Sequence, residues 1–257
     1  MSIVLMYHAL YSDEKDLERI AIEDRPYAVR VDEFCKQLSV LNDYTTGLLN
    51  SEREEVPEVL VTFDDGHVSN YDRAMPLLVE AGVKAYFFIT SDFVGKRQHF
   101  CTAAQLREMA DAGMVIGAHG KTHRFFADLE DQKAIEAFSD SRGVLEEAIG
   151  RQVDSMSFPG GRYRTENLEQ ATTCGYREIY GSGFGPVQML ADGSYVSPIN
   201  RIPLKQTTHI DNFQQIVAVN RQYYAREMMK TSCKVMLKRM LGNNRYHALY
   251  KFAAERH

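Results

Sequence analysis

The chain has 257 residues, of which 44% are hydrophobic, and its formal net charge is −5. These values suit a single sizeable core, and the acidic balance, together with the lack of an aromatic and basic groove motif, excludes nucleic acid as the expected partner. The chain shows no apolar run of membrane-spanning length, no basic start of a signal peptide and no Cys-x-x-Cys pair, so we expect a cytoplasmic protein with reduced thiols.

Buried strands alternate with helices along most of the chain. The first strand is expected at Ile3 to Tyr7, with His8 at its end. Residues 11 to 31 are polar and are expected to be irregular, with Arg25-Pro26-Tyr27 as a loop over the mouth of the barrel. Further strands are expected at 59–63, 83–90, 115–118, 156–158 and 176–180. Helices are expected between them, three of which we place after the caps Asp32, Thr102 and Thr165. This alternation predicts an α/β fold with a parallel sheet.

The strand at 59–63 ends on two adjacent carboxylates. Val59 to Phe63 is an apolar run typical of a strand that is buried on both faces, and Asp64, Asp65 and Gly66 follow it directly. Successive side chains of a strand point in opposite directions, so the two carboxylates can face one site only if the strand breaks there. One carboxylate is then available to bind a cation and the other to face a reactant. A lone Asp-Asp-Gly is more typical of a solvated turn, so this interpretation needs further ligands.

A second strand supplies them. The apolar run that starts at Val115 ends in His119 and His123, and the glycines at 117 and 120 indicate a strand end followed by a tight loop. Two neutral imidazoles at this separation can converge on one metal ion. One carboxylate and two imidazoles form the ligand set of a catalytic zinc site that keeps positions open for water.

These motifs resemble those of a known family. Three segments, TFDDG at 62–66, HGKTH at 119–123 and FPGGRY at 158–163, resemble in order and spacing the first three motifs of the polysaccharide deacetylases, the NodB-like group also called carbohydrate esterase family 4. The opening LMYH at 5–8 and the closing NRIP at 200–203 resemble members found in bacterial exopolysaccharide and surface-glycan clusters. The resemblance covers about residues 1 to 205. It implies a single distorted barrel of seven or eight β/α units, followed by a helical tail.

The resemblance also implies roles for individual residues. Asp65, His119 and His123 are the implied metal ligands, with zinc as the expected ion, and Asp64 is the implied catalytic base. The Pro159-Gly160-Gly161 turn lets a backbone N–H approach a reacting oxygen, and the resemblance assigns the oxyanion contact to Gly160. Arg162, Tyr163 and Arg201 are expected to contact the sugar, although each could equally hold a loop in place.

Several features of the family are missing. Ser157 stands where the third motif usually has an arginine that orients the catalytic aspartate, Gly120 replaces a Ser or Thr, and the chain has no tryptophan. The closing Leu-x-His motif is absent too, so the general acid is open. We expect His8 to take this role, because the first and last strands of a barrel are neighbours, with His209 as the alternative. His67 and His99 are expected to be solvated loop residues.

The tail differs in charge from the rest of the chain. Residues 211–257 hold nine Lys or Arg and three Asp or Glu, and residues 1–210 are correspondingly acidic. Val217, Tyr224 and Met228 among these basic residues indicate a partly amphipathic helix, which either packs on the barrel or contacts the anionic inner face of the cytoplasmic membrane. We therefore divide the chain into a barrel, 1–210, and a basic tail, 211–257.

Three functions fit these residues. The first is a metal-dependent hydrolase that removes N-acetyl groups from a saccharide, lipid-linked or free, during assembly of a bacterial surface glycan. The second is a glycan-binding or scaffold protein that has lost catalysis along with the missing motifs. The third is hydrolysis of another amide, such as a formamide or a cyclic imide. The retention of Asp64 beside the three ligands favours an enzyme, because a binding protein has no need of a base.

Overall fold

The computed structural model describes residues 1–49, 56–190 and 195–230. By internal contacts the chain divides into two units, Met1–Phe213 and Gln214–His257. The first unit contains the sheet, the motifs and the predicted site residues.

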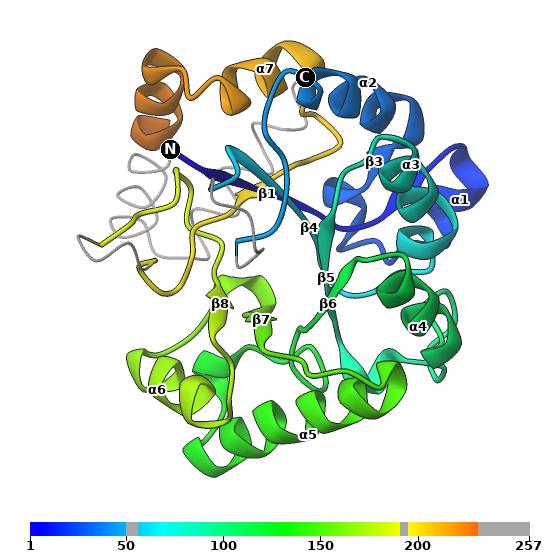
Figure 1. Cartoon of the computed structure of the whole chain (residues 1–257), viewed down its shortest axis with the longest axis vertical. Helices are drawn as coiled ribbons and strands as arrows, with labels where there is room; N and C mark the ends of the chain where they lie inside the picture. The colour runs from blue at the N-terminus through cyan, green and yellow to red at the C-terminus, as the bar shows by residue number, and fades with distance from the viewer. Residues whose placement is uncertain (50–55, 191–194, 231–257) are drawn as a thin grey trace, which may run out of the picture. The chain divides into compact units, whose positions relative to one another are not determined.

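The first unit is built on one parallel sheet of seven strands, as the sequence predicts. Its order is β8-β7-β6-β5-β4-β1-β9, and every pairing between neighbours is parallel. The sheet curls into a half-barrel with the helices on its outer side, which confirms the predicted α/β class (Figure 1). Its strands are β1 (Ile3–Tyr7), β4 (Val59–Phe63), β5 (Ala85–Ile89), β6 (Val115–Ala118), β7 (Ser155–Ser157), β8 (Glu178–Tyr180) and β9 (Ile202–Pro203).

The last strand lies beside the first. β9 pairs with β1 through Leu5 and Ile202, while an isolated parallel bridge joins Tyr180 at the end of β8 to Ile199. The backbone N–H of Gly181 also donates to the carbonyl of Ile199 at 2.9 Å. The segment before β9 therefore connects the two edges of the sheet, so residues near 200 reach the same end of the half-barrel as the motifs on β4 and β6.

The helices largely follow the predicted positions. Thr102 caps its helix with a full capping box, and the three apolar positions predicted for the helix after Asp32 are buried. Asp32 itself is not the cap, because the helix begins one residue earlier, and Thr165 likewise lies inside its helix behind Arg164. The helices are α1 (Glu14–Glu18), α2 (Val31–Leu41), α3 (Met75–Glu80), α4 (Ala103–Asp111), α5 (Asp131–Ile149), α6 (Thr165–Thr173) and α7 (Ile210–Val217).

The stretch from residue 11 to 31 is more ordered than the expected loop. It contains α1, which Asp13 caps by accepting from the N–H of Asp16, and a 3-10 turn, Arg25–Tyr27. Two short strands, β2 (Leu10–Tyr11) and β3 (Val29–Arg30), pair in parallel at its two ends. This pairing closes the stretch on itself and fixes the residues between the two strands.

An aromatic stack fills the core beneath the site. The ring of Phe63 lies between those of Tyr7 and Phe87, with centroids 5.2 and 4.9 Å away, so β1, β4 and β5 are packed together just before their polar ends.

The described chain contains three free thiols, of which that of Cys101 is buried. Cys233 lies outside the described residues.

The second unit is described as far as residue 230. Residues 221–230 are helical, and the rest of the basic tail falls outside the part that the structure covers. Among residues 1–49, 56–190 and 195–230, no helix combines the length and the apolar character that crossing a membrane requires.

Candidate active site

The carboxyl ends of the strands surround a cavity of about 560 Å³. This is the end of a parallel α/β sheet at which active sites lie. The cavity brings together seven of the nine predicted site residues: His8, Asp64, Asp65, His119, His123, Gly160 and Arg201. The two others, Arg162 and Tyr163, do not line it.

Asp64 and Asp65 are adjacent in the chain and still line the same cavity. The break that the sequence argument requires falls at Asp65, whose φ is +74°, and continues at Gly66 with a φ of +84°. The left-handed region is unfavourable for a residue with a Cβ, and such strain is typical of functional sites. A side chain at Gly66 would meet Ile89 at 3.0 Å, so this position needs glycine for space as well as for conformation.

The three predicted ligands converge. One ligand atom from each of Asp65, His119 and His123 lies within 4.8 Å of the others. Oδ1 of Asp65 is 3.1 Å from Nε2 of His123 and 3.4 Å from Nε2 of His119, and it accepts no well-formed hydrogen bond within the described chain. A buried carboxylate oxygen facing two imidazole nitrogens fits a divalent metal ion. His123 also has a φ of +61°, so two of the three ligands have left-handed backbones.

His119 is held as a neutral imidazole. Burial lowers the pKa of His119 to about 4, and the nearby carboxylates only partly oppose this effect. Its Nδ1 lies 2.6 Å from Oγ of Ser157 and 3.1 Å from the carbonyl oxygen of the same residue. A neutral ring whose Nδ1–H is engaged in this way has the lone pair of Nε2 available for a metal ion.

Asp64 is held by Arg201. The guanidinium donates from Nη1 to Oδ1 at 2.6 Å and from Nη2 to Oδ2 at 2.7 Å, which is a bidentate pair between two fully buried side chains. Burial alone would raise the pKa of Asp64, but Arg201 and His119 outweigh it, so this pKa lies below its ordinary value. Asp64 is therefore an ionised carboxylate of fixed orientation.

This geometry corrects the role expected for Arg201. Its Nε donates to the carbonyl of Gly181 at 2.7 Å and its Nη1 to Oγ1 of Thr62 at 3.2 Å, in addition to the two bonds to Asp64. Four of the five guanidinium N–H groups are thus used within the protein, and the side chain has no exposed surface. Arg201 orients Asp64 and leaves little for a sugar hydroxyl.

His8 lies at the end of β1, as predicted. Its carbonyl accepts from Nδ2 of Asn70 at 2.7 Å, which fixes the backbone, and its ring faces the cavity that holds Asp64 and Asp65. Its Nδ1 is buried and has no hydrogen-bond partner among the described residues. The alternative, His209, is exposed and does not line this cavity.

Gly160 lies on the wall of the same cavity. Its φ is +59°, and a Cβ at this position would stand 2.7 Å from the ring of Phe125. Only glycine therefore fits between Phe125 and the cavity. The turn keeps the backbone of Gly160 at the wall of the cavity.

Arg162 and Tyr163 lie farther along the same loop. Arg162 is exposed, donates to Asp128 at 3.3 Å and stacks on Phe125, so its contacts are those of a residue that holds the loop. Tyr163 stacks on Phe158, with 4.7 Å between centroids, and lines a separate cavity of about 460 Å³. The two cavities share Gly161 and Ser182, so Tyr163 borders an extension of the site.

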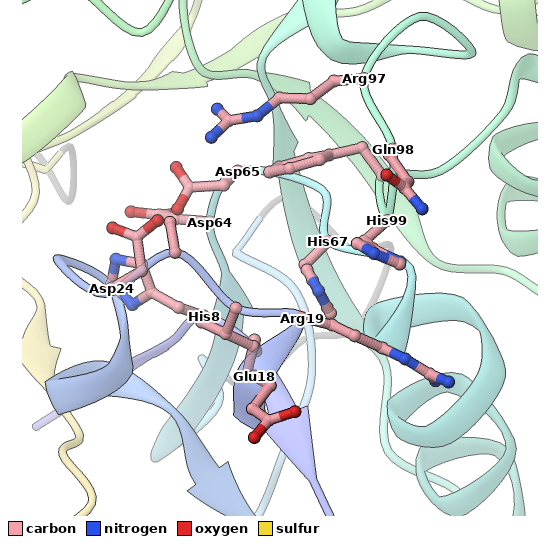
Figure 2. A pocket seen from close by; sticks show the side chains of 14 residues that line it. His8, Glu18, Arg19, Asp24, Asp64, Asp65, His67, Arg97, Gln98 and His99 are labelled. Carbon is pink, nitrogen blue, oxygen red and sulfur yellow. The ribbon is translucent and has the colours of Figure 1, made fainter. Parts of the chain in front are cut away.

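A third cavity, of about 300 Å³, extends the site on another side (Figure 2). The side chains of His8, Asp24, Asp64 and Asp65 gather at one end of it, and His67 lies toward the other end (Figure 2). The first four of these residues also line the main cavity. The two cavities are therefore neighbours with a shared wall.

Asp24 was not predicted. Its carboxyl group is partly buried and lies close to the charge of Asp65, and both effects raise the pKa of Asp24. Asp24 belongs to the stretch that was expected to be irregular, and its only signal in the sequence is the acidic character of that stretch.

His67 is not the solvated loop residue that the sequence predicts. It is buried and hydrogen-bonded to Ser69, because a bridge from His67 to Phe100 holds its loop against residues 99–101.

The chain is similar to known proteins in sequence and in fold. Residues 51–179 match the family model for polysaccharide deacetylase. A protein of Bacillus subtilis (strain 168), YxkH, whose name assigns it to the polysaccharide deacetylases, is 35% identical over 119 residues, which are 46% of this chain and 42% of that protein. The match thus spans less than half of that relative's length.

Solved structures share the fold. The Streptococcus pyogenes deacetylase PplD, in complex with acetate, superposes with a TM-score of 0.71 at 23% identity, over 84% of this chain and 97% of that one. A de-N-acetylase from Aggregatibacter actinomycetemcomitans gives 0.70 at 18% identity, over 84% and 99% of the two chains. At such identities the likeness concerns the fold, while the family model covers half of the chain. The chain belongs to the polysaccharide deacetylase family.

Proposed function

We propose that this protein is a metal-dependent hydrolase that removes N-acetyl groups from a saccharide. The main observation behind this proposal is that two adjacent carboxylates in one cavity have different partners. Asp65 meets the nitrogens of His119 and His123, whereas Arg201 holds both oxygens of Asp64. A binding protein has no use for a carboxylate that is kept ionised and oriented beside a ligand set.

The roles of the residues follow from their positions. Asp65, His119 and His123 would hold a divalent ion, which makes a bound water acidic near neutral pH and polarises the amide carbonyl. The two imidazoles and one carboxylate favour zinc. Asp64 is ionised and adjacent, so it accepts the proton of the attacking water.

Two further groups complete the reaction. The turn at Gly160 brings backbone N–H groups to the developing oxyanion. His8, on the wall beside Asp64, donates a proton to the leaving amine, which turns the amide nitrogen into a good leaving group. The acetate and the free amino sugar then leave through the open side of the cavity.

Two alternatives remain testable. The first is a scaffold role, which the serine at position 157 and the missing tryptophan favour. The second is a different amide substrate, which no particular residue of the cavity favours. The experiment is acetate release from a panel of N-acetylated saccharides, with formylated sugars and cyclic imides beside them, assayed with added zinc and with a chelator. Chelator-sensitive acetate release supports the proposal. Turnover of only the other amides, or of none of the panel by zinc-loaded protein, rejects it.

We extend the proposal to the setting of the reaction, a lipid-linked or free saccharide at the inner face of the cytoplasmic membrane. The support is the charge of the tail, which includes Arg221, Arg226 and Lys230 in its described part, since basic residues gain about 1 kcal/mol each near an anionic membrane. Sedimentation with anionic vesicles at low and high salt tests it. Salt-sensitive binding that is lost in a chain ending near Asp211 supports membrane contact, and no binding by the intact protein at low salt excludes it.

A further inference from the structure

Ser157 lies between two groups with different tasks. It ends β7, next to β6, and it has no exposed surface. Its Oγ is 2.6 Å from Nδ1 of His119 and 3.4 Å from Oδ1 of Asp64. One buried hydroxyl thus touches both a predicted metal ligand and the predicted base.

The direction of these hydrogen bonds follows from the neighbours. The carbonyl oxygen of Ser157 lies 3.1 Å from Nδ1 of His119 and can only accept, so Nδ1 carries the N–H that is directed at Ser157 and donates to its hydroxyl. Asp64 accepts from Arg201 on both carboxylate oxygens, so it is a carboxylate that can only accept. The hydroxyl of Ser157 therefore accepts from His119 and donates to Asp64, and both of its neighbours are satisfied by this one arrangement.

We propose that Ser157 is a positioning residue that couples the two halves of the site, because it fixes the tautomer and ring orientation of the ligand His119 and, through the same hydroxyl, the carboxylate of the base Asp64. The assignment rests on the proposed function for the role of Asp64. Its part toward His119 rests on geometry alone.

A second acceptor sets the size of the expected effect. The carbonyl oxygen of Ser157 stands 3.1 Å from the same Nδ1, so the ring keeps a longer hydrogen bond when the hydroxyl is removed. Arg201 likewise keeps its two bonds to Asp64. Loss of a group that orients a metal ligand typically lowers affinity or activity by about 10- to 100-fold, and with these substitutes we expect the lower end of that range.

The chain offers a matched control on the same strand. Ser155 lies two residues earlier, so its side chain points to the same face of the sheet. It is 1% exposed, and its Oγ has no hydrogen-bond partner within the described chain. Ser155→Ala therefore removes the same atom from an equally buried place without touching His119 or Asp64.

The experiment measures zinc affinity by competition with a chromophoric chelator, and then kcat and KM, for the parent and for Ser157→Ala, Ser157→Thr and Ser155→Ala. We expect Ser157→Ala to bind zinc about 10-fold more weakly and to lose kcat with little change in KM. Ser157→Thr, which keeps the hydroxyl, should recover most of the loss, and Ser155→Ala should match the parent. Ser157→Cys replaces any variant that does not fold, and as a weak donor it should resemble Ser157→Ala.

Two results would overturn the assignment. The first is parental zinc affinity and parental kcat in Ser157→Ala. The second is an equal loss in Ser155→Ala, which would assign the effect to packing. Zinc binding needs no substrate, so a parent that releases no acetate would defeat the proposed function and still leave the contact with His119 open to this measurement.

Discussion

The imidazole of His8 lies against the ring of Tyr27, with 5.0 Å between the ring centroids and 32° between the planes. Tyr27 belongs to the stretch between β2 and β3 and lines the main cavity. The contact fixes His8 in a wall that also contains Asp64. We expect His8→Ala to lower turnover by about 10²- to 10⁴-fold with zinc content unchanged, because a general acid contributes on this scale.

The split between kcat and KM separates this role from a structural one. A general acid acts on the leaving amine in the transition state, so His8→Ala should lower kcat with little change in KM. The exposed His209 supplies the control variant His209→Ala. A parental kcat in His8→Ala beside an inactive His209→Ala would move the role to His209.

Gly160→Ala should lose both activity and stability. The residue needs a φ of +59°, and the added methyl would stand 2.7 Å from Phe125, so we expect a loss of more than about 1 kcal/mol in the free energy of unfolding. Gly143→Ala is the control, because Gly143 lies in α5 with no atom within 4 Å of an added Cβ. It should gain up to about 1 kcal/mol of helix propensity. Denaturant unfolding of the parent and the two variants measures the two changes in stability, and acetate release measures the loss of activity.

Arg201→Met should destabilise the protein by about 3–5 kcal/mol, because it leaves the buried carboxylate of Asp64 without its partner. The double variant Arg201→Met with Asp64→Asn removes the orphaned charge as well. We expect it to be more stable than Arg201→Met alone, as measured by urea unfolding at neutral pH. Equal stability of the single and double variants would mean that the unpaired carboxylate of Asp64 does not destabilise Arg201→Met.

The metal-free protein should lose stability as the pH falls. Burial lowers the pKa of both His67 and His119 to about 4, against an ordinary value of 6.5. The unfolded chain therefore takes up protons near pH 6.5 that the folded chain refuses until about pH 4, so stability is full above this window and declines through it. His67→Asn should flatten the decline and the exposed His209→Asn should not, in urea melts of chelated protein between pH 4 and 7.

The sequence predicts the sheet and the convergence of Asp65, His119 and His123 because each rests on a local pattern. The apolar runs before Asp64 and His119 determine where the strands end, and parallel strands bring those ends to one edge. Thr102 is a cap that the residue type alone identifies. Strand ends and helix caps depend on neighbouring residues in the sequence, so they can be predicted without knowing which elements pack together.

The contacts of Arg201, Ser157 and Asp24 depend instead on which elements meet. Arg201 lies 137 positions from Asp64, and only the closure of the sheet at β9 brings the two together. The contact of Ser157 with His119 forms only because the neighbouring strand places the imidazole ring beside it. Asp24 is positioned by the pairing of β2 with β3, which is too short to be distinguished from a loop by its residue pattern.

The division of labour between Asp64 and Asp65 is the central claim, and one paired measurement tests it most directly. Zinc content by elemental analysis and acetate release are determined for the parent, Asp64→Asn and Asp65→Asn, with His119→Ala as the reference for a lost ligand. We predict that Asp64→Asn keeps one zinc per chain and loses activity by about 10²- to 10⁴-fold, whereas Asp65→Asn loses zinc as His119→Ala does. Equal zinc loss in the two aspartate variants, or full activity in Asp64→Asn, would contradict the account.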